Sequence, residues 1–224
     1  KVSIIAAATL RSHSYLNLLL SLSVTIERIF ILDDGNFLPG QRCSDKNGSM
    51  ASKLIELANN NKIVFSIFSS NVNDKALVKE VSDLASSLIV YSGFGGQILK
   101  NDILSCGKKI LHIHSGLLPE YRGSTTIYYA LLNNDNLGAT AILLDQNIDT
   151  GIIVGERSYP RPEKGVDIDF DLDIQYRSKL LSTVVRDFVS NGSFKMEKKQ
   201  DMNAGKTYYI AHPVLRHIAL LSNS

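Results

Sequence analysis

This 224-residue sequence has few cysteines and almost no excess of charge of either sign. Cys43 and Cys106 are its two cysteines, too few for a disulfide scaffold, and no clustered Cys/His spacing indicates structural zinc. Lys and Arg number 24 against 22 Asp and Glu, for a net charge of +2. Proteins that wrap nucleic acid show a strong basic excess. We therefore expect a reduced, cytoplasmic protein that binds no nucleic acid.

Long hydrophobic runs are also missing. No apolar run approaches the roughly 18 residues that a membrane-spanning helix needs. The opening KVSIIAAATL holds an apolar stretch of about six residues, shorter than that of a signal peptide. We therefore expect it to be a buried first strand and the protein to have no membrane partner. The composition, 44% hydrophobic and 21% charged, is that of an ordinary globular domain.

Short apolar runs alternate with amphipathic stretches of helical length through the first half of the chain. Strands are predicted at residues 2–8, 28–32, 62–68, 88–91 and 110–113, and helices at 12–23 and after Ser49 and Asn73. This alternation predicts βαβ units, and so an α/β fold with a mostly parallel twisted sheet flanked by helices. Ligands of such sheets bind beyond the carboxyl ends of the strands.

The second half continues the pattern and then changes. A helix at 124–133, strands at 139–144 and 152–155 and a helix at 174–190 are predicted, with Asn191-Gly192 ending the last helix. Strand-like pieces follow at 194–198 and 207–210. We predict a main domain over 1–190 and a short C-terminal hairpin or arm over 191–224. Its apolar side chains, including Tyr209, Val214 and Ile218, are expected to be buried, for instance in a homodimer interface.

The densest group of reactive side chains is His112-Ile113-His114, at the end of a predicted strand. Residues i and i+2 of a strand point to the same face, so the two imidazoles project together. They could supply a general acid/base and a second polarising donor, or be simply a hydrogen-bonded pair. HxH is also half of a metal site, but no third ligand lies at a characteristic spacing, so no metal is expected.

Two further loops follow strands. In Asp145–Gly151, the carboxylates of Asp145 and Asp149 either cap turns or, brought near His114, hold its imidazole in one tautomer. In Ser92–Leu99, glycines would let a ligand approach the backbone closely. The dinucleotide and phosphate-loop patterns are incomplete there, so a plain strand-to-helix turn is the alternative.

Together these loops resemble the folate-dependent formyltransferases of the methionyl-tRNA formyltransferase type. The resemblance is carried by HIHSGLLPEYRGSTTIYYALLNNDNLGATAILLDQNIDTGIIV, from His112 to Val154, and by GFGGQIL. The family has an Asn-x-His, a Leu-Leu-Pro turn, a helix, a Gly-Ala/Val-Thr strand and an Asp-Thr/Ala-Gly loop. The resemblance implies a Rossmann-like formyltransferase fold, with N10-formyltetrahydrofolate as the formyl donor and a primary amine as the acceptor.

By position, His114 matches the family's catalytic histidine and Asp149 its catalytic aspartate. His112 stands where the family has Asn, whose amide stabilises the oxyanion. A His112 N–H can do the same with the right tautomer. The substitution leaves a formyl-folate hydrolase or a non-catalytic relative as the alternative.

The resemblance also implies binding residues. The folate pocket would be formed by Phe94, Gly95, Gly96, Gln97, Ile98 and Leu99 of one loop and by Leu144, Asp145 and Ile148 of the other. The acceptor would meet the turn and helix start formed by Ser115, Gly116, Arg122, Ser124 and Thr125. For the hydroxyl residues, helix capping is the alternative.

Three kinds of acceptor compete. Glycinamide ribonucleotide formyltransferases have a Gly-Ser-rich loop after the first strand, whereas residues 7–13 contain no glycine. Methionyl-tRNA formyltransferases have a C-terminal barrel, for which the segment after Ser190 is expected to be too short. The RGSTT turn and the tail GKTYYIAHPVLRHIAL resemble enzymes that formylate nucleotide-linked amino sugars. We therefore expect a small amino-sugar nucleotide as the substrate.

Overall fold

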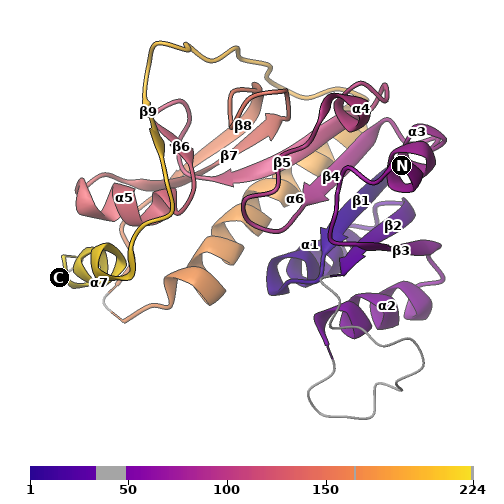
Figure 1. Cartoon of the computed structure of the whole chain (residues 1–224), viewed down its shortest axis with the longest axis horizontal. Helices are drawn as coiled ribbons and strands as arrows, with labels where there is room; N and C mark the ends of the chain where they lie inside the picture. The colour runs from indigo at the N-terminus through magenta and orange to yellow at the C-terminus, as the bar shows by residue number, and fades with distance from the viewer. Residues whose placement is uncertain (34–48, 164, 223–224) are drawn as a thin grey trace. The chain divides into compact units, whose positions relative to one another are not determined.

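The computed structural model describes residues 1–33, 49–163 and 165–222 and divides into two compact units, Lys1–Leu111 and His112–Ser224. The hydrogen-bonded order of the strands is β3-β2-β1-β4-β5-β7-β8, with a separate pair β6-β9 (Figure 1). This mostly parallel sheet flanked by helices confirms the predicted α/β fold class. Cys43 lies outside the described residues. The predicted boundary at residue 190 stays a prediction.

The first unit is built on four parallel strands: β1 (Val2–Ala7), β2 (Ile26–Asp33), β3 (Phe65–Ser69) and β4 (Leu88–Ser92). All six residues of β1 are buried, as a central strand with both faces covered requires. The opening apolar stretch is therefore a core strand, as predicted.

The described helices of this unit are α1 (Leu10–Ser21), α2 (Met50–Asn60), α3 (Lys75–Ser82) and the short α4 (Asn101–Leu104). Three of these four helices begin at a side-chain cap, and α4 begins without one. The Ser49 hydroxyl accepts the N–H of Ser52, and the Asp74 carboxylate accepts the N–H groups of Ala76 and Leu77. Side chains that accept the first free N–H groups fix a helix start. The predicted starts of α2 and α3 are thus confirmed.

The division between the two units falls within strand β5 (Lys109–Ser115), after Leu111. In the second unit, β7 (Leu137–Leu143) pairs antiparallel with β8 (Ile152–Tyr159). A π-helical turn (Ile168–Leu172) leads into α6 (Asp173–Asn191), which packs on β7 and β8. A Cβ on Gly155 would lie 2.6 Å from Val184 Cγ2, so glycine lets α6 approach the strand. Gly192, at φ 72°, ends α6 as predicted.

The C-terminal arm differs from the predicted hairpin. Strand β9 (Lys206–Tyr208) pairs in parallel with β6 (Tyr121–Gly123), and the segment 194–198 contributes only a bridge between Lys198 and Ile153. The chain then forms α7 (Pro213–Leu221), which packs on α5 (Thr126–Leu132). Figure 1 shows β9 beside β6 and α7 beside α5. The residues around β9 could not predict this pairing, because its partner β6 lies more than 80 residues earlier in the chain.

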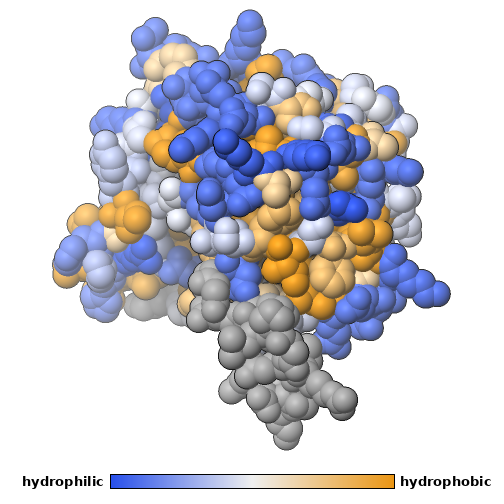
Figure 2. Space-filling model, turned by 45° about the vertical axis from the view of Figure 1, so that its right-hand side comes forward, coloured by the Kyte–Doolittle hydropathy of each residue, from blue (hydrophilic) through white to orange (hydrophobic). Residues whose placement is uncertain are grey.

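Several apolar side chains of the arm are exposed within the chain. Tyr209 is 82% exposed, Val214 58% and Ile218 46%, so burial of these side chains in a homodimer interface stays a prediction. Figure 2 shows a face where hydrophilic residues predominate, with hydrophobic residues grouped between them. Among the described residues, no helix is long and apolar enough to cross a membrane.

Candidate functional site

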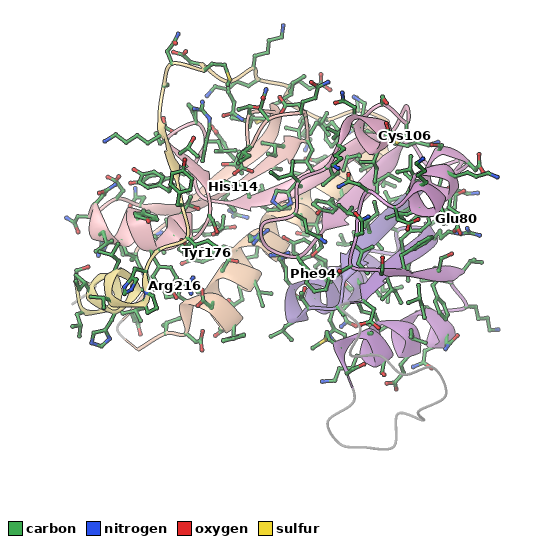
Figure 3. All side chains as sticks on the ribbon, in the orientation of Figure 1. Glu80, Phe94, Cys106, His114, Tyr176 and Arg216 are labelled. Atoms are coloured by element: carbon green, nitrogen blue, oxygen red, sulfur yellow. The ribbon has the colours of Figure 1, made fainter. Side chains whose placement is uncertain are left out.

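His112 and His114 lie at the carboxyl end of β5, where sheets of this class carry their functional residues. His112 is half-buried and His114 is 4% exposed. Because they are two residues apart in one strand, they share a face. His114 is labelled in Figure 3.

The tautomer of His114 follows from its contacts. Its Nε2 lies 2.6 Å from the carbonyl oxygen of Tyr121. A carbonyl can only accept, so Nε2 carries the hydrogen and donates it. In the neutral ring Nδ1 therefore holds a lone pair, and it faces Asp149 Oδ2 at 3.4 Å. The fold thus leaves the basic nitrogen of His114 beside the Asp149 carboxylate.

Asp149 is positioned by its own backbone and by two neighbours. It lies in the left-handed region at φ 55°, which Asp tolerates better than most residues. A Cβ on Gly151 would come within 1.8 Å of the Leu143 carbonyl oxygen, so glycine is needed for the chain to pass. The Gly123 N–H donates to Asp149 Oδ2 at 2.8 Å. The loop therefore presents one defined carboxylate oxygen to His114.

The C-terminal arm supports this pair. Gln200 Nε2 donates to the carbonyl oxygens of Asp149 and Gly151, both at 2.8 Å. Strand β6, which contacts both His114 and Asp149, is held by β9. Sequence reasoning identified neither Gln200 nor the backbone of Tyr121 and Gly123 as part of the site. No sequence signal identifies these three residues. Tyr121 and Gly123 contribute only backbone groups, and Gln200 lies in a segment distant in the sequence.

Tyr121 is held through the hydroxyl of its own side chain. This hydroxyl donates to Asp135 Oδ2 and accepts from Asn133 Nδ2 at 3.0 Å. Burial, reinforced by the hydrogen bond to Asp135, raises the pKa of Tyr121 to about 12. The phenol therefore stays protonated at neutral pH, and Tyr121 acts on His114 through its carbonyl.

The residues predicted to bind folate from the second loop have different surroundings. Asp145 Oδ1 accepts from the Asn147 N–H at 3.1 Å and from the Thr150 hydroxyl at 2.7 Å, which is the turn-capping role. Leu144 packs against a small core of Leu118, Ile142 and Ile153. Ile148 is 50% exposed. In this loop, Ile148 is the apolar side chain that a ligand can reach.

The residues predicted to hold the acceptor make contacts with the arm. Arg122 is 6% exposed, and its Nη2 donates to the Asp201 carbonyl at 2.9 Å. The Ser124 N–H donates to the Tyr208 carbonyl at 2.9 Å, and the Thr125 hydroxyl accepts the Ala211 N–H at 2.8 Å. Thr125 starts α5 without capping it. Through the Arg122 and Thr125 side chains and the Ser124 backbone, this segment joins the arm to β6 and α5, and its role toward the acceptor stays a prediction.

Ser115 and Gly116 are held from α5 and β7. The Thr126 hydroxyl donates to the Ser115 carbonyl, and the Thr140 hydroxyl donates to that of Gly116 at 2.7 Å. Gly116 has φ 145°, where a side chain would be strained. The Ser115 hydroxyl is buried without a hydrogen-bond partner in the described part of the chain.

The predicted folate loop of the first unit is ordered by Gln97. Its Oε1 accepts the Phe94 N–H at 3.0 Å and the Tyr91 hydroxyl at 3.3 Å, and its Nε2 donates to the Ser70 carbonyl. Burial raises the pKa of Tyr91 to about 12, so its hydroxyl remains a donor. Gln97 therefore shapes the loop through backbone contacts.

The same loop presents a surface that suits a flat ring. In the described part of the chain, no atom beyond the flanking residues lies within 4 Å of a Cβ built on Gly95 or Gly96. Ile98 is 56% exposed and half-buried Phe94 stands nearby in sequence, whereas Leu99 is buried. Open glycine backbone beside exposed apolar side chains fits a pterin, which needs close approach and apolar contact.

The chain resembles known formyltransferases in sequence and structure. The formyl transferase family model matches residues 39–160. Methionyl-tRNA formyltransferase from Campylobacter jejuni (strain RM1221) is 31% identical over 120 residues, which are 53% of this chain and 39% of that protein. The chain thus spans about two fifths of that relative's length.

Two solved structures have the same fold. The sugar N-formyltransferase of Shewanella sp FDAARGOS_354 has a TM-score of 0.64 at 18% identity, covering 99% of this chain and 87% of that one. The N-formyltransferase of Helicobacter canadensis, in complex with folinic acid and dTDP-3-aminofucose, has a TM-score of 0.63 at 19% identity, with coverages of 92% and 70%.

Proposed function

Because this chain belongs to the formyl transferase family, we propose that it transfers a formyl group from N10-formyltetrahydrofolate to the primary amine of a nucleotide-linked amino sugar. The observation that carries the proposal is the pair formed by His114 and Asp149, with Nδ1 and Oδ2 3.4 Å apart. A base whose protonated form faces a carboxylate suits the removal of a proton from an attacking amine.

In the proposed reaction the donor supplies an electrophilic formyl carbon, which the amine attacks. Nδ1 of His114 takes the proton that the amine loses, since Nε2 already donates to Tyr121. Asp149 stabilises the resulting imidazolium. The proton then passes to the leaving nitrogen of the donor. His112 donates an N–H to the formyl oxygen as that oxygen gains negative charge.

Each of the two loops by itself presents a surface that is proposed to contact the donor. The open backbone of Gly95 and Gly96 and the exposed side chain of Ile98 would contact the pterin in the first unit. Ile148 would contribute apolar contact in the second. The complex of the Helicobacter enzyme with folinic acid supports a folate donor.

The choice of acceptor has two supports. The Shewanella sugar N-formyltransferase aligns over 99% of this chain, and the RGSTT turn resembles that group. We propose an acceptor of the dTDP-amino-sugar kind, bound near Ser124 and Thr125.

The test measures tetrahydrofolate release from the formyl donor with and without dTDP-amino sugars. We expect acceptor-dependent release that falls about 10²- to 10⁴-fold in His114→Ala and in Asp149→Asn, the range for a general base. His217→Ala is the matched control, because His217 is exposed on α7. Near wild-type rates in both site variants would overturn the mechanism.

The second candidate function is hydrolysis of the formyl donor. It is favoured by His112, since two imidazoles and a carboxylate whose ligand atoms lie within 4.8 Å of one another can activate a water. Release of tetrahydrofolate that does not depend on any acceptor identifies a hydrolase. Release that requires the amino-sugar nucleotide excludes it as the main activity.

A further inference from the structure

We infer that His112, His114 and Asp149 form a binding site for one divalent transition-metal ion of the zinc class. Their candidate ligand atoms all lie within 4.8 Å of one another. Two imidazole nitrogens and one carboxylate oxygen are the donor set of many three-ligand sites, which leave a fourth position open. The spacing in the sequence did not predict this, because Asp149 comes from a separate loop.

The separation of His114 and Asp149 suits a shared metal ion better than a direct hydrogen bond. Nδ1 and Oδ2 are 3.4 Å apart, whereas a charged N–H···O bond is about 2.7–2.9 Å long. Two ligands at tetrahedral positions, each about 2.0–2.2 Å from zinc, are about 3.4 Å apart. The pair therefore already has the spacing that a bound zinc ion imposes.

Both of these ligands have the outer contacts that orient metal ligands. Nε2 of His114 donates to the Tyr121 carbonyl at 2.6 Å, which leaves the Nδ1 lone pair available as a ligand 3.4 Å from Asp149 Oδ2. Oδ2 of Asp149 accepts the Gly123 N–H at 2.8 Å. A ligating histidine almost always donates its other N–H to such an acceptor. Strand β6 provides both contacts.

His112 completes the set from the same face of β5. It is half-buried, so its imidazole can be approached from solvent. An asparagine there would offer a weak amide oxygen in place of the imidazole nitrogen that zinc prefers. When the ion binds, the ligand atoms must close from the 4.8 Å spread to about 3.4 Å. His112 is therefore the ligand that decides the affinity.

Metal binding would oppose the proposed transfer reaction. A metal on Nδ1 of His114 takes the lone pair that accepts the amine proton. This consequence rests on the proposed function, but the binding itself does not. Zinc should therefore inhibit tetrahydrofolate release, and a chelator should restore it.

The test uses the full chain, stripped of metal and without donor or acceptor. Zn²⁺ is titrated by calorimetry, and Co²⁺ is followed by the visible absorption of its four-coordinate complexes. We expect one ion per chain, bound at least about 100-fold more weakly by His112→Asn, since loss of outer contacts alone costs 10- to 100-fold. His217→Asn, on exposed α7, should bind as the wild type does.

Two results would overturn the inference: no stoichiometric Zn²⁺ or Co²⁺ binding, or binding that is equal in His112→Asn and wild type. Circular dichroism and urea unfolding establish that the variant is folded. If the metal fails to bind while acceptor-dependent release persists, the proposed function survives without the inference. If the metal binds and no release occurs, the inference survives without the proposed function.

Discussion

Gly123→Ala is expected to destabilise the second unit strongly. Gly123 has φ +99°, and a Cβ there would lie 2.0 Å from the carbonyl oxygen of Tyr208 on β9. The backbone conformation alone costs an alanine about 1–3 kcal/mol. Relieving the overlap requires β6 or β9 to shift, at about another 1–3 kcal/mol. We expect a loss of about 4 kcal/mol in the free energy of unfolding.

Gly192→Ala is the matched control for the backbone cost. Gly192 has φ +72°, and nothing lies within 4 Å of a Cβ built on it, so we expect a loss of about 1 kcal/mol. The measurement is urea unfolding followed by circular dichroism. With a slope of about 2 kcal/mol per molar urea, Gly123→Ala should lower the midpoint by about 2 M and Gly192→Ala by about 0.5 M. Equal midpoints for the two variants would refute the role given to the β6–β9 contact.

Three further perturbations follow from the contacts. Gln200→Ala removes two donors from the Asp149 loop, so unfolding free energy should fall by about 1–2 kcal/mol and formyl transfer should slow. The exposed neighbour Lys199→Ala should change neither. In Glu27, the effect of burial, which raises the pKa, is outweighed by two backbone N–H donors, so the pKa is lowered. This stabilisation is present above pH 4.5, the unmodified value, and is lost as pH falls through the lowered pKa. Glu27→Gln should therefore destabilise by about 1 kcal/mol at pH 7 and by progressively less in urea unfolding as the pH falls through the lowered pKa, and an equal loss at every pH would contradict the assignment. Gln97→Ala should weaken folinic acid binding about tenfold in calorimetry, because one lost loop contact is worth about 1.4 kcal/mol; unchanged affinity would show that Gln97 does not shape the pocket.

Local sequence patterns predicted the elements that are defined by their own residues. The sequence predicted the helix starts at Ser49 and Asp74, the buried strand β1 and the end of α6 at Gly192. The helix α7 was not predicted. Pro213 at its start and the spacing of Val214, Leu215 and Ile218 are helical signals, but the strand-like residues before them favoured a hairpin. When a short segment has both patterns, its packing partner determines which secondary structure forms, and here that partner is α5.

The sequence also singled out His112, His114 and Asp149 as candidate site residues, whose roles stay predictions, but it did not predict their mutual contacts. His112 and His114 share a face because a strand alternates, and the resemblance singled out Asp149. The tautomer of His114, the 3.4 Å separation and the contact of Gln200 with the Asp149 loop come from the tertiary structure. They depend on backbone groups, which every residue carries, and on segments distant in the sequence.

The scarcity of cysteine, of excess charge and of long apolar runs is a property of composition, and by itself it indicated an ordinary globular domain. Periodicity then placed the strands and helices of an α/β fold, because side-chain alternation and helix capping are properties of neighbouring residues. Only the tertiary structure brought Asp149 to His114 and laid β9 along β6. Contacts of this kind depend on chain closure over many residues, which no local pattern encodes.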